Sequence, residues 1–449
     1  MSSQFLGLNI GLSGLNVANT SLNTTSNNIA NVNTPGYSRQ KANIITNVPI
    51  QVHNSYGCVG TGSKIENIER IRDEYYDEKY RTNESNLENY STKQYYNELI
   101  EDIFDDSGSG FSNLYDEFVL SIEDIIDNTS TDSKLSFISN LEKLTDYFKS
   151  TEESLISLQK SIDNKIKSSI THVNSVLQEI GNINKQINVL EAQNGNIENL
   201  LDKRDLLLDD LSSYFNIETS QTKSNLISTF HVTTNGINLV NGKDFTDLET
   251  KENTFTEVYE NNNHLTFSNG KLKALFDLRD GLNQGIPHYL EKLNKWKNEF
   301  SDILNQTFEN GYSSINTEGI KILNEDFSVN SKLKENPDLL ATKLDKTSGV
   351  SDCSNLLLLK EKLNENNSKN LLEEILVDSS TNTSNSTTKS IIYKNMKETI
   401  KNNRLSISGV DTDEEAANLI KFQNMYALNS KVIQTFSEIY DRLILYTGV

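Results

Sequence analysis

Residues that could carry catalytic or metal chemistry are scattered along this chain of 449 residues. The histidines, which stand at no spacing typical of metal ligands, are His53, His172, His231, His264 and His288. No nucleophile elbow, P-loop or dinucleotide-binding fingerprint occurs. The glycines of "GCVGTG", residues 57–62, are not followed by the Lys-Ser/Thr pair of a phosphate-binding loop. We therefore interpret this stretch as a turn.

The strongest candidate for a metal site is a loop that begins at Asp105. Ser107, Ser109, Gly110 and Asp116 follow at the third, fifth, sixth and twelfth positions of a calcium loop. Serine replaces two acidic ligands, and the twelfth position lacks the bidentate glutamate that calcium prefers. A loop between two helices is the favoured interpretation, and acidic pairs elsewhere are typical of solvated faces. We predict no enzyme, no metal and no cofactor.

The composition favours extended helical domains over a compact enzyme. The hydrophobic fraction is 35% and the mean hydropathy is -0.54, which leaves much of the surface wet. Lys+Arg number 42 against 63 Asp+Glu, a net charge of -21, so nucleic acid is not an expected partner. No apolar run approaches the ~18 residues of a membrane span. Two cysteines, Cys58 and Cys353, could form one bridge or stay as buried thiols.

The N-terminal segment carries apolar residues at three- and four-residue spacing, which predicts a coiled-coil helix. The members of this stripe are Phe5, Leu8, Leu12, Leu15, Leu22 and Ile29. Gly7, Gly11 and Gly14 interrupt it, and each costs about 1 kcal/mol against alanine inside a helix. We therefore expect this helix to need a partner.

A second stripe of the same spacing lies at the C-terminus. It consists of Phe422, Met425, Asn429, Val432, Phe436, Ile439 and Leu443, followed by Tyr446. Thr412 and Glu415 stand at the spacing of a capping box that would begin this helix. The two stripes are natural partners in a coiled coil, and the alternative is that each packs on the globular body.

Between the first stripe and the rest of the chain stands "NNIANVNTPGYSRQ", residues 27–40. Pro35 and Gly36 suit the central positions of a type II turn that closes on Tyr37. We expect a hinge here, where the helix ends and the chain turns away. Its residues are Asn28, Asn31, Asn33, Thr34, Pro35, Gly36 and Tyr37.

The predicted fold is mainly α with a small β subdomain, elongated and multi-domain, with the terminal helices paired and a split helical bundle between them. In chain order, we expect an inner helix over 1–36 that pairs with 411–449, a first helical part with an extended arm over 37–212, the β subdomain over 213–268, a second helical part over 269–310, an irregular segment over 311–354 and a helical return over 355–410. Within these, a helix should run from near Ile65 towards Phe104, and the polar stretch 378–390 should be a Ser/Thr-rich loop.

The segment from Ser13 to Gln40 resembles the N-terminal signature shared by bacterial flagellar rod, hook and hook-associated proteins. Three further stretches, residues 59–81, 199–212 and 269–293, resemble the hook-associated proteins in particular, and so does the ending from Ser406. The resemblance covers most of the chain in the same order. A reduced outer domain and the Ser/Thr-rich stretch near Asp378 depart from the family pattern.

The resemblance implies a structural axial protein at the junction of hook and filament, self-associated in a ring. The implied partners are the hook protein, the third hook-associated protein and a flagellar export chaperone on the C-terminal helix. It also implies export through the flagellar type III pathway without a cleavable signal, hence an extracellular place in the flagellum. No membrane partner is expected.

Three alternatives come from other readings of the same sequence. Another axial protein, from the hook or distal rod, would share the terminal motifs but not "GKLKALFDLRD", residues 270–280. A flagellum-exported peptidoglycan hydrolase would need a carboxylate pair in its own compact domain. An exported adhesin would need a large exposed middle domain. Neither feature is visible in the sequence.

Overall fold

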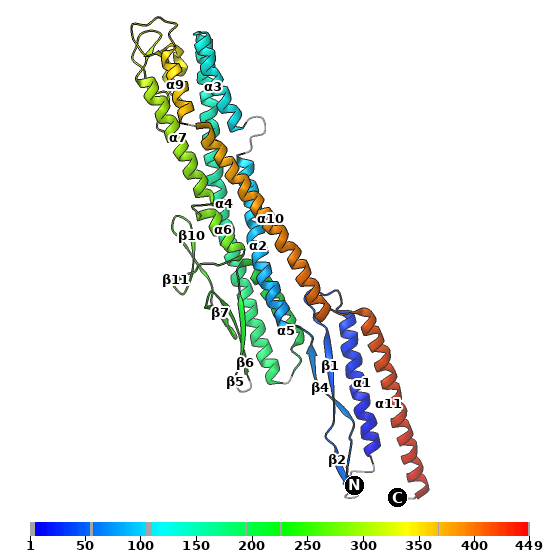
Figure 1. Cartoon of the computed structure of the whole chain (residues 1–449). Helices are drawn as coiled ribbons and strands as arrows, with labels where there is room; N and C mark the ends of the chain where they lie inside the picture. The colour runs from blue at the N-terminus through cyan, green and yellow to red at the C-terminus, as the bar shows by residue number, and fades with distance from the viewer. Residues whose placement is uncertain are drawn as a thin grey trace. The chain divides into compact units, whose positions relative to one another are not determined.

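The computed structural model describes residues 5–53, 57–104, 110–193, 195–224, 227–366 and 368–447. The chain is mainly helical with small sheets, as predicted, and it forms two compact units (Figure 1). Unit 1 contains Met1–Ser85, Val173–Asp247 and Lys394–Val449, whereas unit 2 contains Asn86–His172 and Leu248–Tyr393. Helices α2 (Glu74–Ile103), α4 (Thr131–Ala192) and α10 (Ser368–Ser408) contribute residues to both units.

Unit 1 contains the terminal helices and three small sheets, β1-β4, β2-β3 and β5-β6-β7-β8, among the described residues. Besides parts of α2, α4 and α10, its elements are α1 (Leu6–Ala30), β1 (Gln40–Thr46), β2 (Ile50–His53), β3 (Gly57–Val59), β4 (Ser63–Arg70), α5 (Glu198–Tyr214), β5 (Glu218–Ser224), β6 (Ile227–Thr234), β7 (Ile237–Asn241), β8 (Asp244–Phe245) and α11 (Thr412–Thr447). Within the described residues, β5 to β8 pair in sequence order into an antiparallel sheet.

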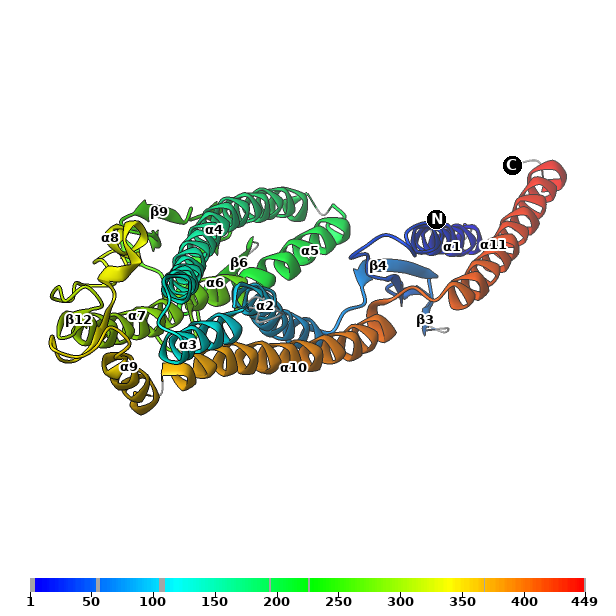
Figure 2. The same ribbon diagram turned by 90° about the horizontal axis from the view of Figure 1, so that it is seen from above.

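Unit 2 has a helical core, a loop-rich end and, among the described residues, two small sheets, β11-β10-β9 and β12-β13. Besides parts of α2, α4 and α10, its elements are α3 (Phe111–Asp127), β9 (Glu249–Glu252), β10 (Thr256–Glu260), β11 (Asn263–His264), α6 (Gly270–Asp280), α7 (Ile286–Glu309), β12 (Tyr312–Ser313), α8 (Ser331–Glu335), the 3-10 helix η1 (Pro337–Leu339), β13 (Ala341–Lys343) and α9 (Ser354–Glu365). Figure 2 shows α9 beside α7, which it contacts.

The aromatic core of unit 2 is centred on Trp296 of α7, the only tryptophan of the chain. Its indole lies between the rings of Phe148 and Phe300, at centroid distances of 4.3 Å and 4.5 Å and nearly parallel to both. The indole Nε1 donates to the carbonyl oxygen of Ser368 at 2.7 Å. The Trp296 ring is therefore buried among apolar rings while its N–H group keeps a hydrogen-bond partner.

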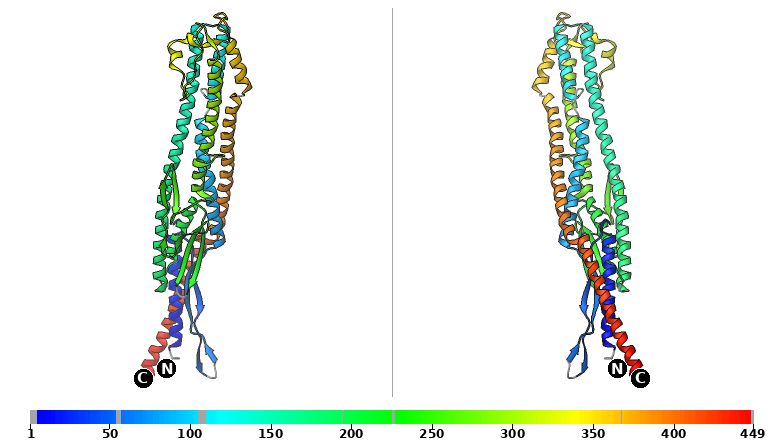
Figure 3. Two further views of the ribbon diagram at one scale, coloured as in Figure 1. Left: turned by 90° about the vertical axis from the view of Figure 1, so that its left-hand side faces the viewer. Right: turned by 90° about the vertical axis from the view of Figure 1, so that its right-hand side faces the viewer.

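An antiparallel ribbon replaces the start of the helix that the sequence analysis placed near Ile65. Strand β4 pairs with β1 from Gln40↔Arg70 to Thr46↔Ser63, with a bulge between Asn43 and Ile44, and α2 begins only at Glu74. The expected helix start is therefore wrong. Ile65 faces Ile44 across the pair, and such cross-strand contacts outweigh local helical tendency. Figure 3 shows this ribbon running alongside α1.

The single β subdomain expected over 213–268 is also wrong, because its strands divide between the units. The sheet β5-β6-β7-β8 belongs to unit 1, and the sheet β11-β10-β9 belongs to unit 2. Asn235 and Gly236 join β6 to β7 in a hairpin, with φ of 48° and 79°. Positive φ at both positions is typical of a type I′ turn.

The polar stretch 378–390, expected as a loop, is helical and lies inside α10. Serine and threonine cost only about 0.5 kcal/mol each against alanine in a helix, so packing decides the outcome. Ser379, Ser386 and Ser390 are buried. The amide of Asn97 donates to Ser386 Oγ at 3.0 Å, and Asn382 donates to the Tyr289 hydroxyl at 2.8 Å. These contacts within unit 2 stabilise the helical form of a stretch whose composition indicated a linker.

Candidate assembly interface

The terminal helices α1 and α11 lie side by side and antiparallel, with both chain ends at the same end of the pair (Figure 1). The contact face of α1 is made by its glycines. A Cβ on Gly7 would collide with the ring of Phe436, one on Gly14 would collide with the Asn429 side chain, and one on Gly11 would come within 3.0 Å of Ile433. The glycines therefore allow close approach of the two helices.

The predicted stripes do not coincide with this contact face along its whole length. On α1, Leu12 is 49% exposed and Phe5 is 52% exposed; Leu8, Leu15, Leu22 and Ile29 have intermediate exposure. On α11, Val432, Ile439 and Leu443 are exposed, while Phe422, Met425, Asn429 and Phe436 are less exposed. A straight helix turns every 3.6 residues, so a strict 3.5-residue stripe drifts away from its partner. The helices pair, but part of each stripe remains uncovered.

The predicted capping box at the start of α11 is wrong. Asp411, not Thr412, accepts from the backbone N–H of Asp413 at 2.9 Å and of Glu414 at 3.3 Å. Glu415 is buried and accepts instead from Arg39 Nε at 2.7 Å. Its carboxylate therefore joins the start of α11 to the end of the turn motif.

The turn motif, residues 27–40, forms the predicted turn. Tyr37 N–H donates to Thr34 C=O at 3.2 Å, and Gly36 has a φ of 78°, as the third residue of a type II turn requires. Asn31 bonds back to the carbonyl oxygen of Asn27 at 2.9 Å and closes the end of α1. Asn33 is exposed at the turn surface. The motif is thus a hydrogen-bonded corner, and its role as a hinge stays a prediction.

Asn28 is the centre of this corner. Its amide nitrogen donates to the carbonyl oxygen of Gln40, and its Oδ1 accepts from the Gln40 N–H, both at 2.9 Å. The hydroxyl of Tyr37 also donates to Asn28 Oδ1 at 2.8 Å. Because Asn28 is 1% exposed, water cannot replace these bonds. The side chain thereby fixes the path of the chain from α1 into β1.

Replacing Asn28 with alanine should lower the free energy of unfolding of unit 1 by about 2 kcal/mol, because buried backbone groups of Gln40 lose their partners. Urea unfolding followed by hydrogen exchange of unit 1 peptides measures this. The matched control is Asn23→Ala on the exposed side of the same helix, which should change stability by less than about 0.5 kcal/mol. Equal effects of the two substitutions would contradict the role of Asn28.

A cluster of arginines and aspartates lies next to the turn motif, entirely within unit 1. Three of its aspartates are spaced along one face of α5, and the fourth lies on α2. The members of this arginine–aspartate cluster are Arg70, Arg72, Asp77, Arg81, Asp202, Asp205, Asp209 and Arg404.

Asp205 is the hub of this cluster. Its carboxylate accepts from Arg70 at 2.5 Å, from Arg72 at 2.9 Å and from Arg81 at 2.9 Å. Burial alone would raise the pKa of Asp205, but the three arginines outweigh burial and lower the pKa to about 2. The aspartate therefore stays ionised and holds the end of β4 and the start of α2 on α5.

The cluster also reaches the turn motif and α10. Asp202 accepts from the Ser38 N–H at 3.0 Å and from the Ser38 hydroxyl at 2.7 Å. Arg404 of α10 pairs with Asp209 at 2.6 Å and with Asp77 at 2.6 Å. Charge-assisted bonds of this kind are the stronger class of hydrogen bond. Together they join the segments that lead into and out of the α1–α11 pair.

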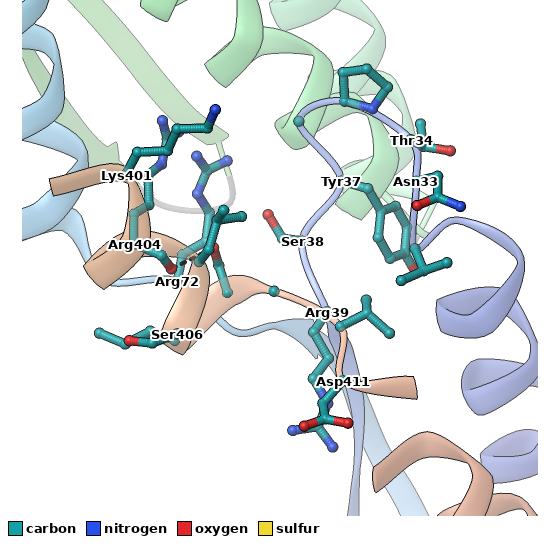
Figure 4. Close-up of a pocket in the computed structure, with 18 of the residues that line it drawn as sticks. Asn33, Thr34, Tyr37, Ser38, Arg39, Arg72, Lys401, Arg404, Ser406 and Asp411 are labelled. Atoms are coloured by element: carbon teal, nitrogen blue, oxygen red, sulfur yellow. Dashed lines mark hydrogen bonds between the residues drawn. The ribbon is translucent and has the colours of Figure 1, made fainter. Parts of the chain in front are cut away.

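Between the turn motif and the end of α10 lies a groove of about 1010 Å³ (Figure 4). Its lining includes Pro35 and Gly36 of the turn, Lys401 and Leu405 of α10, and Leu206 of α5, which lies next to Gly36. Figure 4 shows the turn and the α10 segment facing each other across the hollow. The described residues around it include neither histidine nor cysteine, so the groove offers hydrogen bonds, charge and apolar contact.

The arginine–aspartate cluster was missed from the sequence, although its spacing was readable. Asp202, Asp205 and Asp209 stand three and four residues apart, which places them on one face of a helix. Arg70 and Arg72 stand two apart, at the end of a strand. Only the fold brings these two sets together, because more than 120 residues separate them.

The other candidates for chemistry are not brought together. Asp105, Ser107 and Ser109 lie outside the described residues, Gly110 precedes α3, and Asp116 pairs with Lys369 at 2.7 Å. In the described part of the chain, no three His, Cys, Asp or Glu side chains form a set that could hold a metal ion.

The cysteines form no bridge. Cys353 is buried and Cys58 is exposed on β3 of the ribbon, so the expectation of buried thiols is confirmed for Cys353 and wrong for Cys58. Across the described ranges, no helix is both long enough and apolar enough to cross a membrane.

Comparison with known proteins identifies the class. The chain ends match two models of flagellar rod proteins: "Flagella basal body rod protein" over residues 8–37 and "Flagellar basal body rod FlgEFG protein C-terminal" over residues 401–444. Residues 98–323, half of the chain, match the model "Flagellar hook-associated protein FlgK helical domain". The chain belongs to the flagellar hook-associated protein family.

Two relatives by sequence agree with this family. Flagellar hook-associated protein 1 of Bacillus subtilis is 26% identical over an alignment of 508 residues, which covers 100% of this chain and 99% of the relative. Flagellar hook-associated protein 1 of Salmonella typhimurium is 28% identical over 242 residues, 52% of this chain and 42% of the relative. A solved structure of the flagellar hook junction protein FlgK from Burkholderia pseudomallei aligns with a TM-score of 0.48 at 16% identity, covering 55% of this chain and 46% of that one.

Proposed function

We propose that this chain is a structural subunit of the bacterial flagellum that joins the hook to the filament. The observation that carries this proposal is the match of residues 98–323 to the hook-associated helical domain, between two ends that match flagellar rod proteins. Full-length similarity to a hook-associated protein 1 supports the same function. The groove and the arginine–aspartate cluster suit assembly, and we propose no catalytic activity.

The proposed partners are further copies of this chain in a ring, the hook protein on one side and the third hook-associated protein on the other. The exposed apolar residues of α11, among them Leu428, Ile439 and Leu443, would be covered by a flagellar export chaperone before assembly. We propose export by the flagellar type III route and an extracellular position in the flagellum. The paired terminal helices would form the innermost layer of the assembly.

Deletion of the gene tests this function. Cells without the chain should build hooks, export filament protein into the medium and fail to swim. Complementation with Phe436→Asp should not restore swimming, because the charge would enter the contact between α11 and Gly7. The matched control Ser437→Asp, at an exposed neighbouring position, should restore it. Normal filaments in the deletion strain would contradict the proposed function.

A further inference from the structure

The first part of the chain has an unusual charge distribution. No acidic residue precedes Glu66, and Arg39 and Lys41 are the only charged side chains among the first 63 residues. The whole chain, by contrast, has a net charge of -21, so two copies repel each other over most of their surface. Helix α1 and the outer part of the ribbon, residues 42–63, lie in this stretch and carry no Asp, Glu, Lys or Arg, whereas β4 continues beyond it with charged residues. They offer a surface on which copies can approach without repulsion, and depletion of charge is typical of interface cores.

The ribbon exposes apolar side chains that nothing in the described chain covers. Val48 is 79% exposed, Ile44 is 44% exposed and Ile50 is 38% exposed. Among the described residues, β2 and β3 make their main contacts with each other. A two-stranded ribbon of this kind is marginally stable in water by itself. The tip of the ribbon therefore gains from a partner outside the chain.

The ribbon packs on one face of α1. Gly62 of the ribbon lies against Ser13, and the backbone N–H of Ser63 donates to Ser13 Oγ at 3.3 Å. The predicted stripe lies away from this contact: at about 100° per residue, Leu12, Leu8 and Leu15 stand about 100°, 140° and 160° around the helix from Ser13. Leu8, Leu12 and Leu15 thus form a leucine face that is directed away from the ribbon, and Leu12 on it is exposed.

We infer that copies of this chain associate side by side, with the uncharged outer part of the ribbon, residues 42–63, of one copy on the leucine face of α1 in the next. This inference rests on the proposed function, because it names the surface through which the ring would form. The ribbon and the leucine face are different surfaces of unit 1. Contact between them is heterologous, and such contacts close into rings when the rotation between copies allows it. The same contact would explain why the apolar stripe is longer than the face that α11 covers.

Cys58 allows a direct test, because it is an exposed thiol on the ribbon. In a Cys353→Ala background, Leu12→Cys is expressed in place of the natural chain, and isolated flagella are treated with a short bismaleimide. A ladder of covalent dimers and longer multimers is expected on denaturing gels. Leu15→Cys, on the same face, provides a second variant should Leu12→Cys not be incorporated.

Two controls and two contrary results define the test. The ladder should be lost when Cys58→Ser is added, and it should not form with Lys431→Cys, an exposed position on α11. If each leucine variant, expressed separately, is incorporated into flagella and neither gives a ladder, this interface is wrong and the proposed function still stands. Flagella that lack even the unsubstituted chain would overturn the proposed function and the interface with it.

Discussion

Replacing Asp205 with asparagine should lower the free energy of unfolding of unit 1 by about 3–5 kcal/mol, because one buried and two half-buried arginines lose the buried carboxylate that they share. Arg70, Arg72 and Arg81 each contact it within 2.9 Å, and Asp202 and Asp209 cannot reach all three. The loss is larger than for an exposed ion pair, which contributes about 0–1 kcal/mol. Urea unfolding followed by hydrogen exchange of peptides from α5 measures it.

The matched control for Asp205 is Asp302→Asn, an exposed aspartate on α7 of unit 2. It should leave stability within about 0.5 kcal/mol of the natural chain. If Asp205→Asn were as mild as this control, the arginine–aspartate cluster would not hold unit 1 together.

Asp205 also predicts a pH dependence. Its pKa is about 2 in the folded chain, against ~3.9 for an unfolded aspartate, so folding favours the ionised form. The stability that it supplies is fully present above about pH 4 and is lost as the pH falls towards 2. The difference in unfolding free energy between the natural chain and Asp205→Asn should therefore shrink across this range. A difference that stayed constant from pH 5 to 2 would contradict the assigned pKa.

Replacing Trp296 with alanine should destabilise unit 2 by about 3–5 kcal/mol. The substitution removes the ring stacked between Phe148 and Phe300 and leaves the Ser368 carbonyl oxygen without its indole donor. The surrounding helices cannot close fully around the space, so the cost of the cavity adds to the lost burial. Hydrogen exchange of peptides from α7 measures this, since the natural tryptophan fluorescence is lost with the side chain.

Tyr95→Ala is the control for Trp296. Tyr95 is 58% exposed on α2 within unit 2, so the same change from aromatic to alanine should cost less than about 1 kcal/mol. Similar losses in both variants would mean that unit 2 does not depend on the stack around Trp296. The Asp205→Asn variant keeps Trp296, so its tryptophan fluorescence reports on the folding of unit 2 separately from unit 1.

The sequence predicted the terminal helices, their pairing and the turn motif because these depend on local patterns. Apolar spacing defines a helix, and Pro35-Gly36 defines a turn, whatever surrounds them. The sequence did not predict which face of α1 contacts α11. Gly7 and Gly14 form that face, and in an apolar spacing pattern a glycine counts as a break. The contact depends on how closely the two helix backbones approach, and the spacing of apolar residues in one helix does not give that distance.

Other errors have the same physical origin in tertiary contacts. The segment around Ile65 became a strand through its pairing with β1, more than 20 residues earlier. The stretch 378–390 became a helix through buried serines and bonds to Asn97 and Tyr289. The cluster around Asp205 needed arginines from distant segments. In each of these three cases, contacts between residues far apart in the chain determined the structure, and local residue spacing alone did not.

The position of the chain on intact flagella tests its assignment to the junction. An epitope-tagged copy that supports swimming should be labelled by gold-conjugated antibody in electron micrographs. We predict a single labelled band at the boundary between hook and filament on each flagellum. Label spread along the filament or the hook, or confined to the cell body, would contradict the assignment of this chain to the junction.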